Sequence, residues 1–425
     1  MPAERKQKKY GSPQGIFSIW QGMDVPNWLR LLAGRPPLHF RQALRLALVS
    51  ATSFSNSALK GVEQLLHGRE LRDFKFEQPP VFILGHWRSG TTLLHQLLSN
   101  DPRLICPNLY QILWPHHCLL SEPVVAPLTR WMLPKTRPMD DVAVSWDAPQ
   151  EDETALCNLT GLSPYMMLAY QGQRRKYERF FELKDLTENE LDRWKTAFVT
   201  FLKKVALRNQ KANGKRIPGQ RMLLKSPTHT YRVRLLLELF PDAKFIHIVR
   251  NPYDVFNSAM YLRERLFESN TLGHANHNGA EEDVLLMYDH LFQVFEAERH
   301  LVPQAQFHEL KYEDLEQDPI GELKKLFVQL DFDGFEQLEP KLNGQLDAHR
   351  RFRKNQFEMD NSLKRRIYDR WRGTFDRYNY PSGLNHLSLK NELSPAAEQH
   401  ESCSPAACEL IDQSAKTSGE PLWNA

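Results

Sequence analysis

A loop between two glycines, "GHWRSGTT" at residues 85–92, carries the groups best suited to bind an anion. It follows the apolar run "VFIL" and precedes a leucine-rich segment with helical spacing, so its backbone N–H groups lie at the positive end of a helix. Arg88 adds a cation that can bind two oxygens at once. The other groups that can turn toward the same anion belong to Ser89, Gly90, Thr91 and Thr92. The loop therefore predicts a phosphate-type site.

Two residue types indicate which kind of phosphate the loop is expected to bind. A loop that binds a nucleoside triphosphate carries a Lys after its second glycine, where the side chain reaches the β and γ phosphates, but this chain has Thr91 there. The strand-like run "KFIHIV" is followed by Arg250, where a magnesium-dependent triphosphatase would have an Asp for the metal. A γ-phosphate held by magnesium is therefore not the expected ligand.

Arg250 and Ser258 form a second candidate anion site. They are eight residues apart, which is about two helical turns, so both reach one phosphate only if the turn "RNPYDV" folds back. Taken alone, the Arg would be interpreted as a surface ion-pair partner and the Ser as an ordinary helix residue. Together with the glycine loop, they predict two anion sites at one edge of a sheet, bound without a metal.

Strands that alternate with helices must position these loops. Apolar runs predict strands at residues 81–84, 221–225, 244–249 and in "QFHELKY", and most of them are followed by a segment of helical periodicity. The helix after Arg250 is expected to begin at Asn251 as N-cap with Pro252 in the first turn. This order predicts an α/β fold with a mostly parallel sheet, helices on both faces, and ligands at the carboxyl ends of the strands.

Composition excludes several classes of protein. The chain has 425 residues, 41% of them apolar, and a formal net charge of only +3, so no general field attracts nucleic acid. Five cysteines without paired spacing argue against a disulfide framework, and no apolar run is long enough to span a bilayer. The clusters "HHC" and "HANH" lack a second pair of metal ligands, so no metal site is predicted. These features favour a soluble, cytoplasmic protein.

The chain divides into four expected regions. Residues 1–15 and 387–425 are predicted to be disordered tails, residues 16–78 a helical segment, and residues 79–386 the α/β domain. Within the helical segment, "LHFRQALRLALVSATSF" combines arginines with a leucine-rich face. Docking on its own domain is the preferred interpretation of that face, and contact with a membrane surface is the alternative.

The loop motifs resemble those of the sulfotransferase family, in particular the bacterial-type and tyrosylprotein-type branch with "PRSGTT". The resemblance covers about residues 80–380 and implies a P-loop-like three-layer fold. It implies that residues 88–92 hold the phosphosulfate end of 3′-phosphoadenosine 5′-phosphosulfate (PAPS). It further implies that Arg250 and Ser258 hold the 3′-phosphate, and that Tyr312 of "KYEDLEQDP" lies beside adenine.

Because this chain departs from the family pattern, the resemblance does not decide which residue acts as the general base. Leu93 replaces the Trp that stacks on adenine in cytosolic members, and Asn108 lies where the tyrosylprotein-type branch has a catalytic Glu. The segment "LLKSPTH" supplies Lys225 and His229, which match a catalytic Lys and His of cytosolic members apart from a two-residue insertion. A competing base lies in "SWDAPQEDETAL", with Glu151 and Glu153, of which Glu153 is the second choice after His229.

The expected activity is in-line transfer of a sulfuryl group from PAPS to a hydroxyl acceptor. His229 would deprotonate the acceptor while Lys225 and Arg88 stabilise the departing phosphate. Arg353 or Lys354 could add a contact to the 3′-phosphate. Aromatic runs such as "LSPYMMLAY" favour a lipid-like or aromatic alcohol as acceptor. The alternatives are a P-loop nucleotide kinase and a nucleotide-binding protein without turnover; the oligomeric state is not indicated.

Overall fold

Five parallel strands form one sheet in the computed structural model, which describes residues 18–133, 144–171, 173–214, 217–349 and 359–384. The strand order is β2-β3-β1-β4-β5, and every pair of neighbours is parallel. The strands are β1 (Val81–Leu84), β2 (Leu104–Ile105), β3 (Arg221–Lys225), β4 (Lys244–Val249) and β5 (Phe307–Lys311). The carboxyl ends of β3, β1 and β4, which precede the predicted loops, are therefore neighbours.

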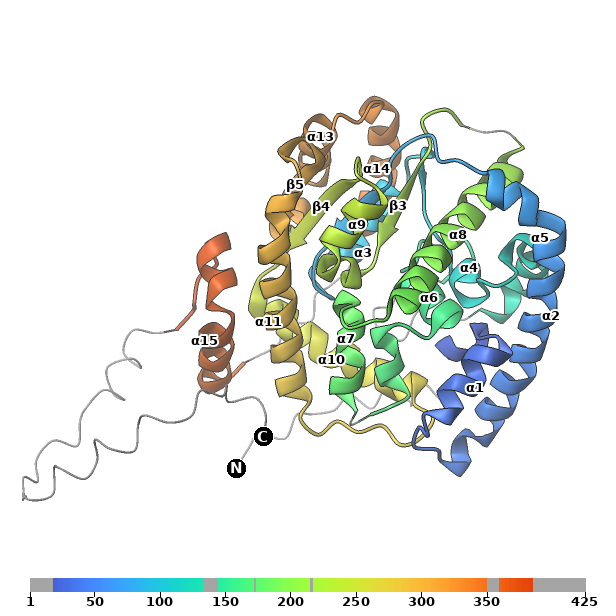
Figure 1. The fold of residues 1–425 in the computed structure, drawn as a ribbon. Helices are drawn as coiled ribbons and strands as arrows, with labels where there is room; N and C mark the ends of the chain where they lie inside the picture. Colours follow the sequence, from blue (N-terminus) through green and yellow to red (C-terminus); the bar gives the residue numbers. More distant parts are fainter. Residues whose placement is uncertain (1–17, 134–143, 172, 215–216, 350–358, 385–425) are drawn as a thin grey trace, which may run out of the picture. The chain divides into compact units, whose positions relative to one another are not determined.

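Alternating side chains give the sheet two buried faces. Phe82 and Leu84 of β1 pack into one apolar core, whereas Val81 and Ile83 pack into the other. The first core also contains residues of α8 (Glu188–Asn213) and α9 (Val233–Leu239), and the second contains residues of α3 (Thr91–Leu98) and α13 (Pro319–Gln329). In Figure 1, α9 lies in front of the strands and α3 behind them. The predicted three-layer α/β fold is confirmed.

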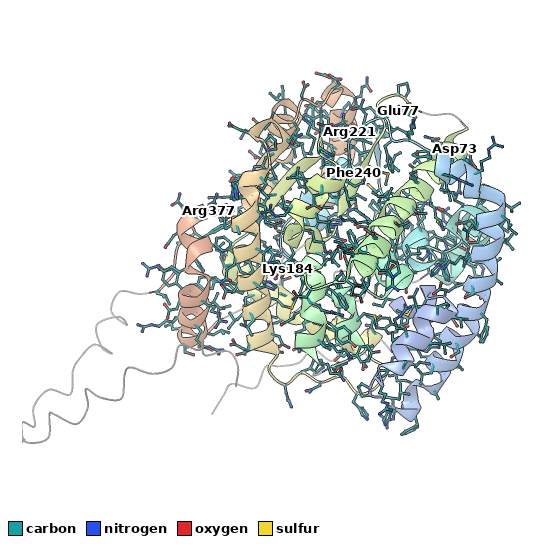
Figure 2. All side chains as sticks on the ribbon, viewed as in Figure 1. Asp73, Glu77, Lys184, Arg221, Phe240 and Arg377 are labelled. Carbon is teal, nitrogen blue, oxygen red and sulfur yellow. The ribbon has the colours of Figure 1, made fainter. Side chains whose placement is uncertain are left out.

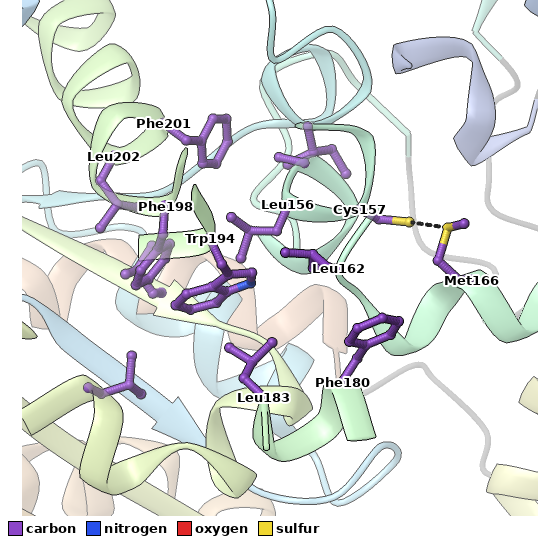
Figure 3. Close-up of a cluster of buried hydrophobic side chains, with 14 of the residues drawn as sticks. Leu156, Cys157, Leu162, Met166, Phe180, Leu183, Trp194, Phe198, Phe201 and Leu202 are labelled. Atoms are coloured by element: carbon purple, nitrogen blue, oxygen red, sulfur yellow. Dashed lines mark hydrogen bonds between the residues drawn. The ribbon is translucent and has the colours of Figure 1, made fainter. Parts of the chain in front are cut away.

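Large aromatic side chains fill the space between the layers. Phe240, which follows α9, lies over the strands in Figure 2, and its ring centroid is 6.2 Å from that of Phe82. Figure 3 shows Trp194 and Phe198 of α8 near Leu156 of α6 (Glu153–Thr160), with the sulfur of Cys157 contacting that of Met166 at 3.9 Å. This core fixes α6, whose first turn carries the acidic residues of the site.

The segment before the first strand is helical. It comprises η1 (Ile19–Gly22), α1 (Val25–Ala33), η2 (Phe40–Gln42) and α2 (Ala43–Asp73). One stripe of α2, including Arg45, Val49 and Asn56, is buried, and Asn56 donates hydrogen bonds to the carbonyls of Gln21 and Met23. This stripe docks on the domain, but Leu38 and Leu44 of the leucine-rich segment are exposed, so the preferred docking of that face holds only in part. No helix in the described ranges is apolar over a length that would cross a membrane.

The remaining helices lie outside the sheet. Asn251 caps α10 (Pro252–Asn270), as predicted, by accepting a hydrogen bond from the amide of Tyr253. The others are α4 (Leu109–Leu113), α5 (Cys118–Thr129), η3 (Arg130–Met132), η4 (Pro164–Leu168), α7 (Arg174–Glu182), η5 (Pro227–Tyr231), α11 (Ala280–Glu298), η6 (Arg299–Leu301), η7 (Gln304–Gln306), α12 (Tyr312–Gln317), α14 (Phe335–His349) and α15 (Asn361–Tyr378).

By its contacts the chain separates into two units, Met1–Pro381 and Ser382–Ala425. The first contains every element named above, and of the second only residues 382–384 are described. The predicted disordered tails, residues 1–15 and 387–425, lie outside the described residues, as do Arg353 and Lys354.

Candidate functional site

The glycine loop forms a tight turn between β1 and α3. Gly90 is the N-cap of α3 with φ 101°, a left-handed conformation that favours glycine. Arg88 adopts φ 72°, which is uncommon for a residue with a side chain and is held by the surrounding contacts. The Ser89 hydroxyl donates a hydrogen bond to the His86 carbonyl over 2.8 Å, and this bond stabilises the turn. Thr91 is buried and Thr92 is half-buried at the start of α3.

Arg250 lies directly against this turn. Its Nη1 donates to the Arg88 carbonyl over 3.3 Å, and its guanidinium lies 4.4 Å from the centre of the Tyr312 ring. Tyr312 in turn packs on Gly90, because a Cβ at Gly90 would come within 2.2 Å of the Tyr312 ring. The Arg88 Nε donates to the Ser258 hydroxyl over 2.7 Å. The structure therefore brings the two predicted anion loops together at one edge of the sheet.

The contact between Gly90 and Tyr312 leads to a first prediction. Gly90→Ala should displace the Tyr312 ring, which also contacts Arg250, and adenosine 3′,5′-bisphosphate, the ligand that the loop motifs imply, should then bind about tenfold more weakly or worse. Titration calorimetry measures the affinity. Gly279→Ala is the matched control: Gly279 is also a left-handed N-cap, but nothing lies within 4 Å of its added Cβ. Equal affinity in the wild type and Gly90→Ala would contradict the prediction.

Lys225 ends β3 on the other side of β1. The side chain is buried, and its Nζ lies 2.6 Å from Glu151 Oε1. The other oxygen of Glu151 accepts a hydrogen bond from the Tyr165 hydroxyl over 2.7 Å. Burial, followed by the negative charge of Glu151, raises the pKa of Tyr165 well above its usual value, so the phenol keeps its proton. The Glu151 side chain is 25% exposed, so part of its carboxylate is accessible to solvent.

His229, the predicted base, lies in the interior of the protein beside Asp152. Its side chain is fully buried, its Nε2 is 2.9 Å from an oxygen of the fully buried Asp152, and its ring packs against Phe82 and Phe198. Burial by itself would raise the pKa of Asp152, but the charge and hydrogen bond of His229 outweigh it and hold that pKa below its usual range. The imidazole therefore has one structural partner, Asp152, while its buried Nδ1 has no hydrogen-bond partner among the described residues.

Glu153, the second predicted base, is also enclosed. It is fully buried, and its Oε2 accepts hydrogen bonds from Arg232 Nη1 and Thr228 Oγ1, each over 2.7 Å. Three consecutive acids thus have three basic partners from one short segment: Glu151 pairs with Lys225, Asp152 with His229, and Glu153 with Arg232. Of these acids only Glu151 is part-exposed, and it is the residue that the sequence could not single out.

An apolar cavity of about 280 Å³ adjoins these groups. His86 and Trp87 of the glycine loop line one side, and Tyr165, the partner of Glu151, lines another. Burial lowers the pKa of His86 to about 4, and its Nδ1 lies 2.8 Å from the Trp87 carbonyl oxygen while its Nε2 has no hydrogen-bond partner. Much of the remaining wall is apolar and includes Met167, Leu168, Phe181, Leu262, Leu266, Phe267, Val284 and Met287.

The site thus combines two arginine-bearing loops at the sheet edge with an adjoining apolar cavity, an arrangement that suits a group-transfer enzyme. Residues 79–337 match the sequence pattern described as "Sulfotransferase family". The chain is 36% identical over 380 residues to omega-hydroxy-beta-dihydromenaquinone-9 sulfotransferase Stf3 of Mycobacterium bovis, covering 89% of this chain and 94% of the relative. The chain belongs to the sulfotransferase family, as its motifs suggested, and it is a sulfotransferase.

Solved structures support the same fold. Sulfotransferase STF9 from Mycobacterium avium superposes with a TM-score of 0.63 at 18% identity, covering 84% of this chain and 92% of that one. STF1 from Mycobacterium tuberculosis H37Rv gives a TM-score of 0.57 at 18% identity, over 84% and 94% of the two chains. The family match and the 36% identical relative, rather than these structures, make the kinase and the inactive nucleotide-binding protein the less favoured alternatives. Among the described residues, no three His, Cys, Asp or Glu side chains are grouped to hold a metal ion.

Proposed function

We propose that this sulfotransferase moves the sulfuryl group of PAPS to the hydroxyl of a lipid-like acceptor. The observation that supports this proposal most is the convergence of two arginine-bearing loops beside the apolar cavity. Arg250 contacts the Arg88 carbonyl, Arg88 contacts Ser258, and the loop residue next to Arg88 lines the cavity. A donor with an anionic group at each end fits two such loops, and an apolar alcohol fits the cavity.

Each end of the donor has its own set of residues in this proposal. The phosphosulfate end binds the turn that starts α3, where backbone N–H groups, hydroxyls and the helix dipole favour negative charge. Arg250 and Ser258 bind the 3′-phosphate, and the Tyr312 ring, stacked under Arg250, lies beside the adenine. Burial raises the pKa of Tyr312 to about 12, so the ring stays neutral there. The residues proposed for the phosphosulfate end are Arg88, Ser89, Gly90, Thr91 and Thr92.

Glu151 takes the role of general base in this proposal. A carboxylate offers four lone pairs, of which the contacts to Lys225 and Tyr165 use two, so a hydroxyl at the cavity end can donate to it. The acceptor oxygen bonds to sulfur, the bond from sulfur to the bridging phosphate oxygen breaks, and the acceptor proton passes to Glu151. Lys225 and Arg88 stabilise the negative charge that develops on the leaving phosphate.

His229 and Glu153 then support the site without touching the substrate. Their complete burial and their pairs with Asp152 and Arg232 fit positioning residues, which hold the acidic loop and the end of β3 in place. His86 is a further group for the acceptor, because its unpartnered Nε2 belongs to a side chain that lines the cavity. We assign it to positioning of the acceptor hydroxyl.

The volume of the cavity is consistent with a long-chain acceptor of which the protein encloses only one end. Ligand pockets commonly measure about 300–1,000 Å³, so a cavity of about 280 Å³ holds a small group or the end of a larger molecule. The Mycobacterium bovis relative is named for a hydroxylated menaquinone. We infer a hydroxylated lipid of this kind for the present chain as well.

The described cysteines, Cys106, Cys118 and Cys157, are free thiols, which supports a reducing compartment such as the cytoplasm.

Donor analogues test the proposed 3′-phosphate site. The wild type should bind PAPS more tightly than adenosine 5′-phosphosulfate, which lacks the 3′-phosphate, and Arg250→Met should shrink that preference by about 10- to 100-fold, since charged hydrogen bonds are lost. Calorimetry with both ligands provides the four affinities. An equal loss for both ligands would contradict the assignment of Arg250. Preference for ATP with magnesium over PAPS would contradict the donor itself.

A further inference from the structure

Three large apolar side chains are exposed close together where the helical segment turns into α2. Leu38 is 55%, Phe40 is 77% and Leu44 is 61% exposed. Phe40 and Leu44 are four residues apart across η2 and the first turn of α2, a spacing that brings side chains to one side of a helix. We call Leu38, Phe40 and Leu44 the apolar patch. Their exposure has a cost in water, and the burial of Arg45 and Val49 shows that the opposite stripe of α2 is the one that packs inward.

The charged residues that flank the apolar patch in the sequence are all positive. Arg35 and Arg41 are exposed on either side of Leu38, and the Arg41 guanidinium lies 5.9 Å from the centre of the Phe40 ring. From residue 25 to residue 62 the sequence contains no Asp or Glu, although it contains four arginines and a lysine. Exposed apolar side chains flanked by arginines, with no acid nearby in the sequence, suit a surface that is apolar inside and negatively charged outside.

The apolar patch adjoins the mouth of the cavity. The His39 amide donates to the Leu272 carbonyl over 3.0 Å, and the His39 ring lies 3.9 Å from the ring of His274. A few residues further on, the same loop provides Asn276 and Asn278 to the cavity wall, and both are exposed. In Figure 1 this loop runs from α11 toward the N-terminal end of α2. One loop, residues 271–279, therefore connects the apolar patch with the opening of the cavity.

We propose that the apolar patch docks this protein on the surface of an anionic lipid bilayer, with the cavity mouth turned toward the lipid. Phe40 and the two leucines enter the boundary between headgroups and acyl chains, and Arg35 and Arg41 contact the phosphates. The docking itself rests on the patch alone. Its use, which is to pass a hydroxylated lipid from the leaflet into the cavity, rests on the proposed function.

Vesicle flotation of the full chain tests the docking. Wild type should float with phosphatidylcholine vesicles that contain phosphatidylglycerol and much less with phosphatidylcholine alone, and added salt should weaken the binding. The variant with Phe40→Asp and Leu44→Asp should lose about tenfold or more of its vesicle binding. Leu65→Asp is the matched control, because Leu65 is 87% exposed on the same helix but about 31 Å further along it. All three positions face solvent, so thermal melting should show folded variants.

Two kinds of result would overturn the proposal. Absence of wild-type flotation on anionic vesicles is one, and an equal loss of binding in the Leu65 variant is the other. A wild-type dimer in gel filtration that the patch variant converts to monomer would instead assign the patch to a second copy of this chain. Turnover separates the proposals further: the patch variant should keep its rate with a short water-soluble alcohol and lose rate with a lipid alcohol in vesicles. Loss of all sulfuryl transfer with intact flotation would contradict the proposed function alone.

Discussion

Glu151→Gln is expected to lower kcat by about 10²- to 10⁴-fold while leaving the affinity for PAPS within a few-fold of wild type. The amide keeps the size of the side chain but cannot take the acceptor proton, and the donor residues Arg250 and Ser258 lie on other loops. Single-turnover rates with a hydroxylated acceptor measure the effect, and calorimetry measures donor binding. Thermal melting must accompany both, because Lys225 loses the charge of its partner.

Two further variants distinguish the possible bases. His86→Gln should raise KM for the acceptor more than it lowers kcat, since His86 is assigned to positioning. His229→Asn should lower the melting temperature and leave most of the turnover of the folded fraction, since its imidazole is enclosed with Asp152. If His229→Asn removed turnover without loss of stability, while Glu151→Gln remained active, the assignment of the base would return to His229. The same outcome for His86 would assign the base to His86.

Glu153→Gln is expected to destabilise the protein by about 3–5 kcal/mol, the largest effect on folding that we predict. The substitution leaves the Arg232 guanidinium, which is 1% exposed, without its charged partner, although its bonds to the carbonyls of Phe180 and Phe181 remain. Urea unfolding followed by circular dichroism measures the change in the free energy of unfolding.

A double variant and a surface pair serve as controls for this effect. Adding Arg232→Met should recover part of the stability lost in Glu153→Gln, because the buried charge that lacks a partner is removed. Asp376→Asn breaks the exposed pair with Arg372 and should change stability by about 0–1 kcal/mol. If Glu153→Gln cost no more than Asp376→Asn, the buried pair would not contribute to the stability of the fold as described.

Local sequence patterns were sufficient for the elements that carry the anion loops. The strands β1, β3 and β4 are short runs rich in apolar residues, β5 mixes apolar and polar residues, and α10 begins with a recognisable cap at Asn251, so each was predicted from adjacent residues. The region from β2 to α8 was not. β2 has only two residues and pairs with β3, more than one hundred positions later, and α5 contains Pro123 and Pro127. Such elements depend on distant contacts that a local pattern does not contain.

The residues of the candidate site also differ in whether a local sequence pattern could indicate them. Both anion loops are continuous in the sequence, so residue type and spacing indicated Arg88, Arg250 and Ser258, and the structure brings these residues into contact. The choice of a base could not be made from the sequence, because Glu151 and Glu153 are of one type and nearly adjacent. Their different exposure arises from partners at the end of β3 and after η5, which lie 74 and 79 positions further along the sequence.

The three adjacent acid–base pairs have a consequence for the chemistry of the outermost one. Asp152 and Glu153 are fixed by interactions that water does not reach, so the backbone that carries Glu151 has little freedom to shift when charge moves during transfer. In water, part of the barrier to a reaction of this kind comes from reorienting solvent dipoles around the new charge distribution. The two inner pairs hold the backbone beside the outer pair, so in the proposed mechanism Glu151 and Lys225 need little reorganisation as charge moves.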